Sequence, residues 1–136
     1  MKANNIMDIT DLRLSIELKT MGLEQEGEYY WLKTPIGWRL IDHKPVTTKS
    51  FWQYCRAFTG TELANIFNHV AGICNADTQP VLIYHNGEWQ AYIKNPVTFE
   101  NPKVIEKTIG NALARLLILL QSHGVIKIHD GKAIKV

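Results

Sequence analysis

The residues best suited to metal chemistry are five histidines and two cysteines, and their spacing does not favour a metal site. Cys55 and Cys74 are 19 residues apart, whereas structural zinc sites pair their ligands a few residues apart. The sequence contains no Cys-x-x-Cys, His-x-x-x-His or His-Glu-x-x-His pattern. We therefore expect surface histidines and packed thiols, with no metal ligand and no cofactor.

Nucleophilic catalysis has no recognisable constellation in the sequence either. Cys55 shares an apolar stripe with Phe51 and Phe58, which favours a small core residue over a reactive thiolate. There is no Gly-x-Ser-x-Gly elbow, and the glycines form neither a Walker nor a dinucleotide-binding pattern. His85 and Glu88 flank one turn, which is typical of a cross-strand pair. We name no catalytic residue and expect a non-enzymatic protein.

The best candidate for a binding surface is a predicted hairpin over Glu28–Ile41. Its turn, Thr34-Pro35-Ile36-Gly37, has proline where a type I turn favours it and glycine where a following bulge needs positive φ. This turn predicts that Leu32 pairs with Leu40 and Lys33 with Arg39. The core side would then carry Tyr30, Leu32, Trp38 and Leu40. The outer side would carry Tyr29, Trp31, Lys33, Arg39 and Ile41.

This outer side mixes aromatic rings with cations, and three interpretations fit it. Tyr29 and Trp31 are ordinary core if a helix of the same chain covers them while Lys33 and Arg39 reach water. Aromatic and arginine clusters also anchor protein interfaces, and aromatic rings on a basic sheet stack single-stranded bases. We expect Trp31 and Arg39 to share one side and to contact a protein partner or a second copy, with nucleic acid as the less favoured ligand.

Helices are predicted near both ends of the chain. Asp8 or Thr10 would cap the first helix, and Gly22 would end it. Its apolar positions are Leu12, Ile16 and Met21. Asn101-Pro102 would open the last helix, which ends at Gly124. The apolar stripe of that helix is wide and includes Leu116 and Leu117.

The middle of the chain combines helical and hairpin signals. Residues 51–58 show helical spacing, and Thr59 with Glu62 fits a capping box, which predicts one kinked helix or two through Ile73. Asn86-Gly87 is a strong hairpin signal, and Asp130-Gly131 marks a small hairpin at the end. Positive φ is expected at three glycines: Gly37, Gly87 and Gly124.

These elements predict one α+β domain over residues 1–136, with residues 1–7 as a flexible tail. Two or three hairpins would form an antiparallel sheet packed with three or four helices in a layered sandwich. Residues 1–88 carry eight basic and ten acidic side chains, and residues 89–136 carry seven and three. The small net charge of +2 gives little support for nucleic acid. No signal peptide or membrane span is recognisable, so a cytoplasmic location is expected.

Three stretches of the sequence resemble small proteins encoded in phages and prophages, including the phage ABA sandwich domains. They are Glu28–Ile41, Val81–Ala91 and Ala112–Ile126. The resemblance implies helices around an antiparallel sheet and an origin in a mobile element, but no activity and no functional residue. The leading hypothesis is an accessory or protein-interaction protein of a phage-like element. A small nucleic-acid-binding module and an enzyme with an unrecognised site are the alternatives.

Overall fold

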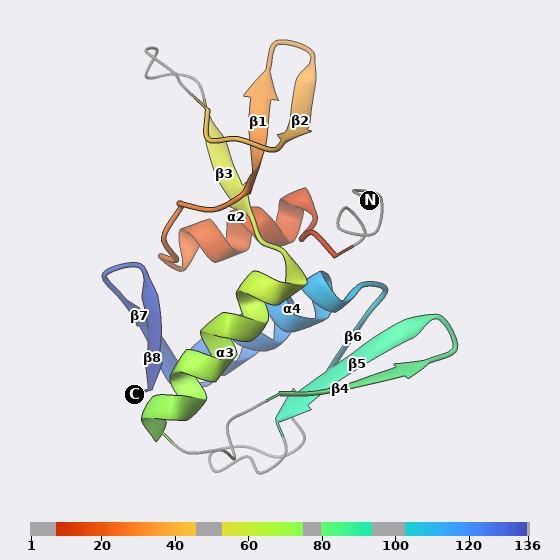
Figure 1. The fold of residues 1–136 in the computed structure, drawn as a ribbon, viewed down its shortest axis with the longest axis vertical. Helices are drawn as coiled ribbons and strands as arrows, with labels where there is room; N and C mark the ends of the chain where they lie inside the picture. Colours follow the sequence, from red (N-terminus) through yellow and green to blue (C-terminus); the bar gives the residue numbers. More distant parts are fainter. Residues whose placement is uncertain (1–7, 46–52, 75–79, 94–102, 136) are drawn as a thin grey trace.

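The computed structural model of the chain describes residues 8–45, 53–74, 80–93 and 103–135 (Figure 1). The tail predicted over residues 1–7 lies outside the described residues, as do Asn101 and Pro102. The described residues form three helices and eight strands, which confirms the predicted α+β class. Their order is α2 (Leu12–Thr20), β1 (Tyr29–Thr34), β2 (Gly37–Ile41), β3 (Tyr54–Ala57), α3 (Gly60–Cys74), β4 (Pro80–His85), β5 (Glu88–Ile93), β6 (Lys103–Glu106), α4 (Ile109–Ser122), β7 (Ile126–His129) and β8 (Lys132–Lys135).

The strands pair in three separate antiparallel sheets, with the orders β2-β1-β3, β4-β5-β6 and β7-β8. The three predicted hairpins are therefore present, but they do not join into one sheet. α3 and α4 pack together at the centre, α4 lies against β5 and β6, and β8 packs on α3 (Figure 1). The β2-β1-β3 sheet projects away from this body, with β3 packed against α2 (Figure 1).

α4 is the centre of the hydrophobic core, as its wide apolar stripe predicts. Leu116 and Leu117 are completely buried. The helix begins at Ile109 after a Thr108 cap, so the predicted start at Asn101-Pro102 is wrong. Residues 103–106 form β6 instead, where Val104 is buried between exposed neighbours with the period of a strand. After the helix, Gly124 has the predicted positive φ of 77°.

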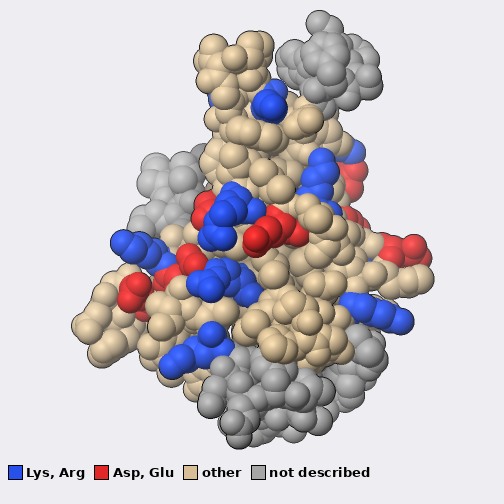
Figure 2. All heavy atoms as spheres, turned by 180° about the vertical axis from the view of Figure 1, so that it is seen from behind, with Lys and Arg blue, Asp and Glu red and all other residues tan. Residues whose placement is uncertain are grey.

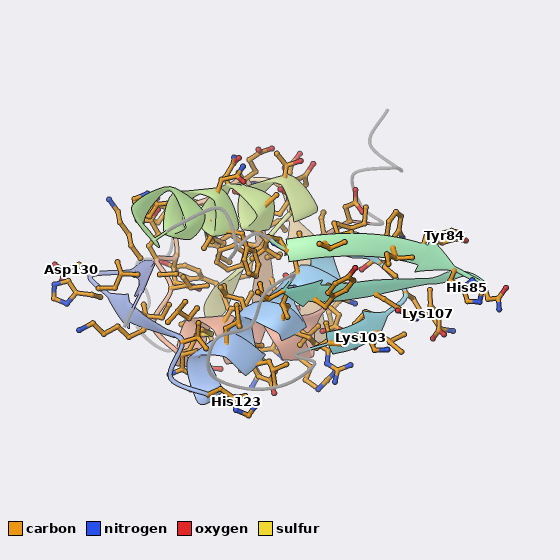
Figure 3. The ribbon with its side chains drawn as sticks, turned by 90° about the horizontal axis from the view of Figure 1, so that it is seen from below. Tyr84, His85, Lys103, Lys107, His123 and Asp130 are labelled. Carbon is orange, nitrogen blue, oxygen red and sulfur yellow. The ribbon has the colours of Figure 1, made fainter. Side chains whose placement is uncertain are left out.

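The β4-β5-β6 sheet confirms the register that Asn86-Gly87 predicts. His85 pairs with Glu88, and both turn residues have positive φ, 51° at Asn86 and 81° at Gly87. One side of the sheet buries Ala91, Ile93 and Val104 in the core that α4 organises. Tyr84 and His85 lie at the outer end of this sheet, at the opposite end of the molecule from Asp130 in the β7–β8 turn (Figure 3).

α3 begins at the capping box that the sequence predicts. The Thr59 N–H donates to Glu62 Oε1 at 2.9 Å, and the Glu62 N–H donates to Thr59 Oγ1 at 3.1 Å. The helix predicted over residues 51–58 is wrong, because residues 54–57 form β3 and pair with β1. Tertiary pairing therefore overrides a short helical spacing. Cys55 is nevertheless buried, as expected for a small core residue.

α2 forms where it is predicted, but with a different cap and a different buried face. Asp11 is the N-cap residue, and its Oδ1 accepts the Leu14 N–H at 2.8 Å. Leu14 and Leu18 face the core, whereas Ile16 is 41 % exposed. Thr10, one of the two predicted caps, instead joins α2 to the end of β3, because its Oγ1 accepts the Phe58 N–H at 2.9 Å.

Candidate functional site

The β1–β2 hairpin is the predicted binding surface, and its strands pair one residue away from the predicted register. Lys33 pairs with Trp38, and Leu32 pairs with Arg39. Thr34 and Gly37 face each other across a two-residue turn, so the bulge expected at Gly37 is absent. Gly37 still has positive φ, 123°. A slip of one residue moves every β2 side chain to the other side of the sheet.

The predicted surface is consequently divided between the two sides of the hairpin. Tyr29, Trp31 and Lys33 share one side, because they alternate along β1. Arg39 lies on the other side, where it pairs with Leu32. The expectation that Trp31 and Arg39 share a side is therefore wrong. The reason is the turn, whose residues fit two loop lengths that differ by one residue.

Trp31 is partly covered by its own chain. Its Nε1–H donates to the Thr10 carbonyl oxygen at 3.1 Å, and the residue paired with it on β3 is the buried Cys55. The base of this side therefore belongs to the packing of the sheet against the start of α2. The free part of the hairpin is its outer end, beyond Trp31.

The outer end of the hairpin is ordered by short polar contacts and exposes an apolar residue. Thr34 Oγ1 donates to the Gly37 carbonyl oxygen at 2.7 Å, and the Ile36 N–H donates to Thr34 Oγ1 at 3.3 Å. Ile36 is 90 % exposed. Lys33 and Arg39 are exposed on opposite sides just behind it, and Trp38 is half-buried. We call these four residues, Lys33, Ile36, Trp38 and Arg39, the hairpin tip.

The base of the same sheet contains a buried cation that the sequence did not single out. Arg56, on β3, is only 8 % exposed. Its Nη2 donates to Glu62 Oε2 at 2.8 Å, and its Nη1 donates to the Glu24 carbonyl oxygen at 3.3 Å. Its guanidinium carbon lies 4.1 Å from the centre of the Phe58 ring. The one available signal is its position between Cys55 and Ala57 in a short apolar run.

Gly27 packs closely against the Cδ–Nε part of the Arg56 side chain. A Cβ atom at Gly27 would lie 2.2 Å from Arg56 Nε. That Nε is buried and has no hydrogen-bond partner among the described residues. The guanidinium is thus held in place by an aromatic ring, a carboxylate and a glycine backbone. The orientation of this cation is therefore fixed, and Glu62 is the carboxylate that pairs with it.

A pocket of about 240 Å³ opens beside Arg56. Its walls come from the loop after α2, from the end of β3, from α3 and from the β7–β8 hairpin. The lining residues are Leu23, Glu24, Arg56, Phe58, Asn65, Ile66, His69, Gly131, Lys132 and Ala133. The Glu24 N–H donates to the Gly131 carbonyl oxygen at 2.9 Å, which closes one wall by joining the loop to the β7–β8 turn.

Among the described residues, no group of three or more histidine, cysteine, aspartate or glutamate side chains is arranged to hold a metal ion. Burial raises the pKa of the Cys55 thiol, and the nearby Lys19 only partly opposes this. Less thiolate is therefore present at neutral pH, which disfavours Cys55 as a nucleophile. No helix in the described part of the chain is long and apolar enough to cross a membrane.

The charged side chains do not form a single basic face in the view opposite to that of Figure 1. Figure 2 shows lysine and arginine interleaved with aspartate and glutamate across the body. Ion pairs among the described residues include Arg115 with Glu106 at 2.8 Å and Lys44 with Glu26. A nucleic-acid site is expected to show a continuous basic patch, and this face does not show one.

The chain matches no protein-family model, no curated protein and no solved structure. The candidate sites therefore depend on their own geometry. Those sites are the hairpin tip and the pocket beside Arg56.

Proposed function

We propose that this chain is a non-enzymatic interaction protein whose hairpin tip docks on a protein partner or on a second copy of the chain. The observation that carries the proposal is the ordered, exposed end of a hairpin that projects from the body (Figure 1). Ile36 stands at that end, 90 % exposed, on a turn that hydrogen bonds hold in one shape. An apolar anchor that is already ordered loses little entropy when it enters a partner's pocket.

The residues around Ile36 fit this role. Lys33 and Arg39 are exposed on the two sides of the hairpin, where rim charges add selectivity more than affinity. Half-buried Trp38 adds an aromatic surface next to them. β2 is also an edge strand of its sheet, so its outer backbone groups are available for pairing with another strand.

The nucleic-acid alternative loses the arrangement on which it depended. It required Tyr29, Trp31, Lys33 and Arg39 on one basic, aromatic side, whereas Arg39 lies opposite to the others. Trp31 is also engaged with the Thr10 carbonyl oxygen. The proposal therefore keeps protein interaction as the function. The origin in a phage-like mobile element stays part of the proposal and is supported by the resemblance of three sequence stretches.

The experiment compares wild type with Ile36→Asp and with Ile83→Asp as a matched control. Ile83 is 44 % exposed on the β4-β5-β6 sheet, so it receives the same change on a different surface. We expect wild type to self-associate in sedimentation velocity, or to cross-link to one defined protein in an extract of its host. Ile36→Asp should lower the apparent affinity by about tenfold or more, because an apolar anchor at the centre of an interface contributes about 1–3 kcal/mol.

Ile83→Asp should retain the association. Both variants should unfold at the same denaturant concentration as wild type, because both positions are on the surface. A wild type that is monomeric and has no partner sensitive to Ile36→Asp would contradict the proposal. Equal loss with Ile36→Asp and Ile83→Asp would also contradict it.

A further inference from the structure

The pocket beside Arg56 is separate from the hairpin tip. It lies at the base of the β2-β1-β3 sheet, where β3 ends and α3 begins, whereas the tip lies at the far end of the same sheet (Figure 1). Its walls belong to segments far apart in sequence, including residues 23–24, 56–58, 65–69 and 131–133. The site therefore exists only in the folded chain.

The stability of the fold does not by itself explain an arginine at position 56. A buried ion pair is weak evidence for stabilisation, because the cost of removing two charges from water offsets much of their attraction. Arg56 pairs with Glu62, yet its buried Nε–H, which lies against Gly27, has no hydrogen-bond partner among the described residues. An apolar side chain would fill the space against Phe58 without that cost. The arrangement therefore indicates a role for the positive charge itself.

The polar groups around the pocket favour an anion over a cation. Lys132, Asn65 and His69 can donate hydrogen bonds at its mouth, and Arg56 supplies a positive charge at its floor. Glu24 is the acidic side chain among the lining residues; Glu62 does not line the pocket, and its ion pair compensates part of the Arg56 charge. Ile66, Ala133 and Leu23 provide an apolar wall for the body of a ligand.

We propose that this pocket binds a small organic anion, with its carboxylate or phosphate group between Arg56 and Lys132 and its apolar part against Ile66 and Ala133. Glu62 and the Phe58 ring hold the guanidinium in one plane, so the Nη hydrogens that do not bond to Glu62 or to the Glu24 carbonyl oxygen keep a fixed direction. The pocket volume of about 240 Å³ suits a short carboxylic acid or a small phosphate ester.

The test is a titration of the isotopically labelled full chain, followed by amide chemical shifts in NMR. Benzoate is the probe for a carboxylate with an apolar body, and inorganic phosphate is the probe for a phosphate group. We expect saturable shifts at residues 23–24, 65–69 and 131–133 with at least one probe below about 20 mM, the range of a weak fragment-sized ligand. Saturation by benzoate alone supports a carboxylate, and saturation by phosphate alone supports a phosphate ester.

Three variants separate a site from general charge effects. Lys132→Glu should weaken binding by at least about fivefold, because it reverses a charge at the anion. Lys127→Glu is the matched control: it makes the same change on the same hairpin, at a position that does not line the pocket, and should change binding by less than about twofold. Glu24→Gln should tighten binding, because it removes the acidic side chain from the rim.

Two results would overturn the proposal. One is the absence of saturable shifts at these amides with both probes. The other is equal weakening by Lys132→Glu and Lys127→Glu, which would show an adventitious ion attracted by net charge. Arg56→Met tests the floor of the pocket: it should abolish binding while thermal unfolding stays cooperative. If Arg56→Met does not fold, the Lys132, Lys127 and Glu24 variants still decide the question.

Discussion

The described residues form two three-stranded antiparallel sheets that differ in strand order and in what packs against them. In β4-β5-β6 the strands follow one another along the chain, whereas in β2-β1-β3 the third strand returns to pair with the first. The first of these sheets buries Ala91, Ile93 and Val104 in the core around α4. The other packs on α2 and buries the cation Arg56 at its base.

The two sheets differ in how much of their surface stays exposed to solvent and to other molecules. A sheet that packs on an apolar helix buries one of its sides, because each apolar residue buried there stabilises the folded state through the hydrophobic effect. A sheet that projects, with hydrogen-bonded turns and a buried charge, is free to present its end and its base to other molecules. The hairpin tip is the end of this projecting sheet, and the Arg56 pocket lies where its base meets the loop after α2, α3 and the β7–β8 hairpin.

The largest expected loss of stability comes from truncating a core residue of α4. Leu117→Ala should lower the free energy of unfolding by about 2–5 kcal/mol, because it leaves a cavity in the centre of the core. Chemical denaturation measures the change. Ile105 on β6 is 42 % exposed, so Ile105→Ala is the control and should cost less than about 1 kcal/mol. Equal losses would mean that Leu117 contributes no more to the core than an exposed residue of β6.

The next effect is expected at the base of the projecting sheet. Gly27→Ala should lower the free energy of unfolding by about 1–3 kcal/mol, because the new Cβ would lie 2.2 Å from Arg56 Nε and 2.9 Å from Arg56 Cδ. Denaturation of Gly27→Ala, Arg56→Ala and the double variant measures the coupling. The cost of Gly27→Ala should fall when Arg56 is truncated. An unchanged cost would mean that Gly27 does not hold Arg56 in place.

The smallest expected loss of stability comes from replacing the glycine in the β1–β2 turn or in the β4–β5 turn. Gly37→Ala and Gly87→Ala should each cost about 1–2 kcal/mol, because a Cβ atom at positive φ clashes with its own backbone. Neither new Cβ would meet another atom within 4 Å, so the cost is purely conformational. Denaturation midpoints measure both losses. A negligible loss at Gly37 would show that the projecting turn adopts another conformation, and the hairpin tip would lose its fixed shape.

Local signals in the sequence predicted the parts of the fold that depend on neighbouring residues. The Thr59–Glu62 capping box and the Asn86-Gly87 turn are both present, because each needs groups only one to three residues apart. The same holds for the β7–β8 turn at Asp130-Gly131, where both residues have positive φ. The buried stripe of α4 was also predictable, because its apolar side chains recur at helical spacing and cover a wide face of the helix.

The errors fell where a distant segment decided between two local options. Residues 54–57 form a strand because β1 pairs with them. Residues 103–106 form a strand because β5 pairs with them. The Thr34–Gly37 turn allowed two registers, and the choice between them placed Arg39 away from Trp31. In each case strand pairing supplies hydrogen bonds that no local pattern encodes.

The sequence by itself determined the α+β class, the turns at Asn86-Gly87 and Asp130-Gly131, the capping box of α3 and the burial of α4. Each of these follows from spacing and backbone preference within a few residues. Only the tertiary structure decided which side of the projecting hairpin is free and that Arg56 is buried beside a pocket. Those features depend on Thr10 meeting Trp31, Gly27 meeting Arg56 and the loop after α2 meeting Gly131. Contacts between residues distant in sequence form only when the whole core has packed, because the core holds the separate segments together.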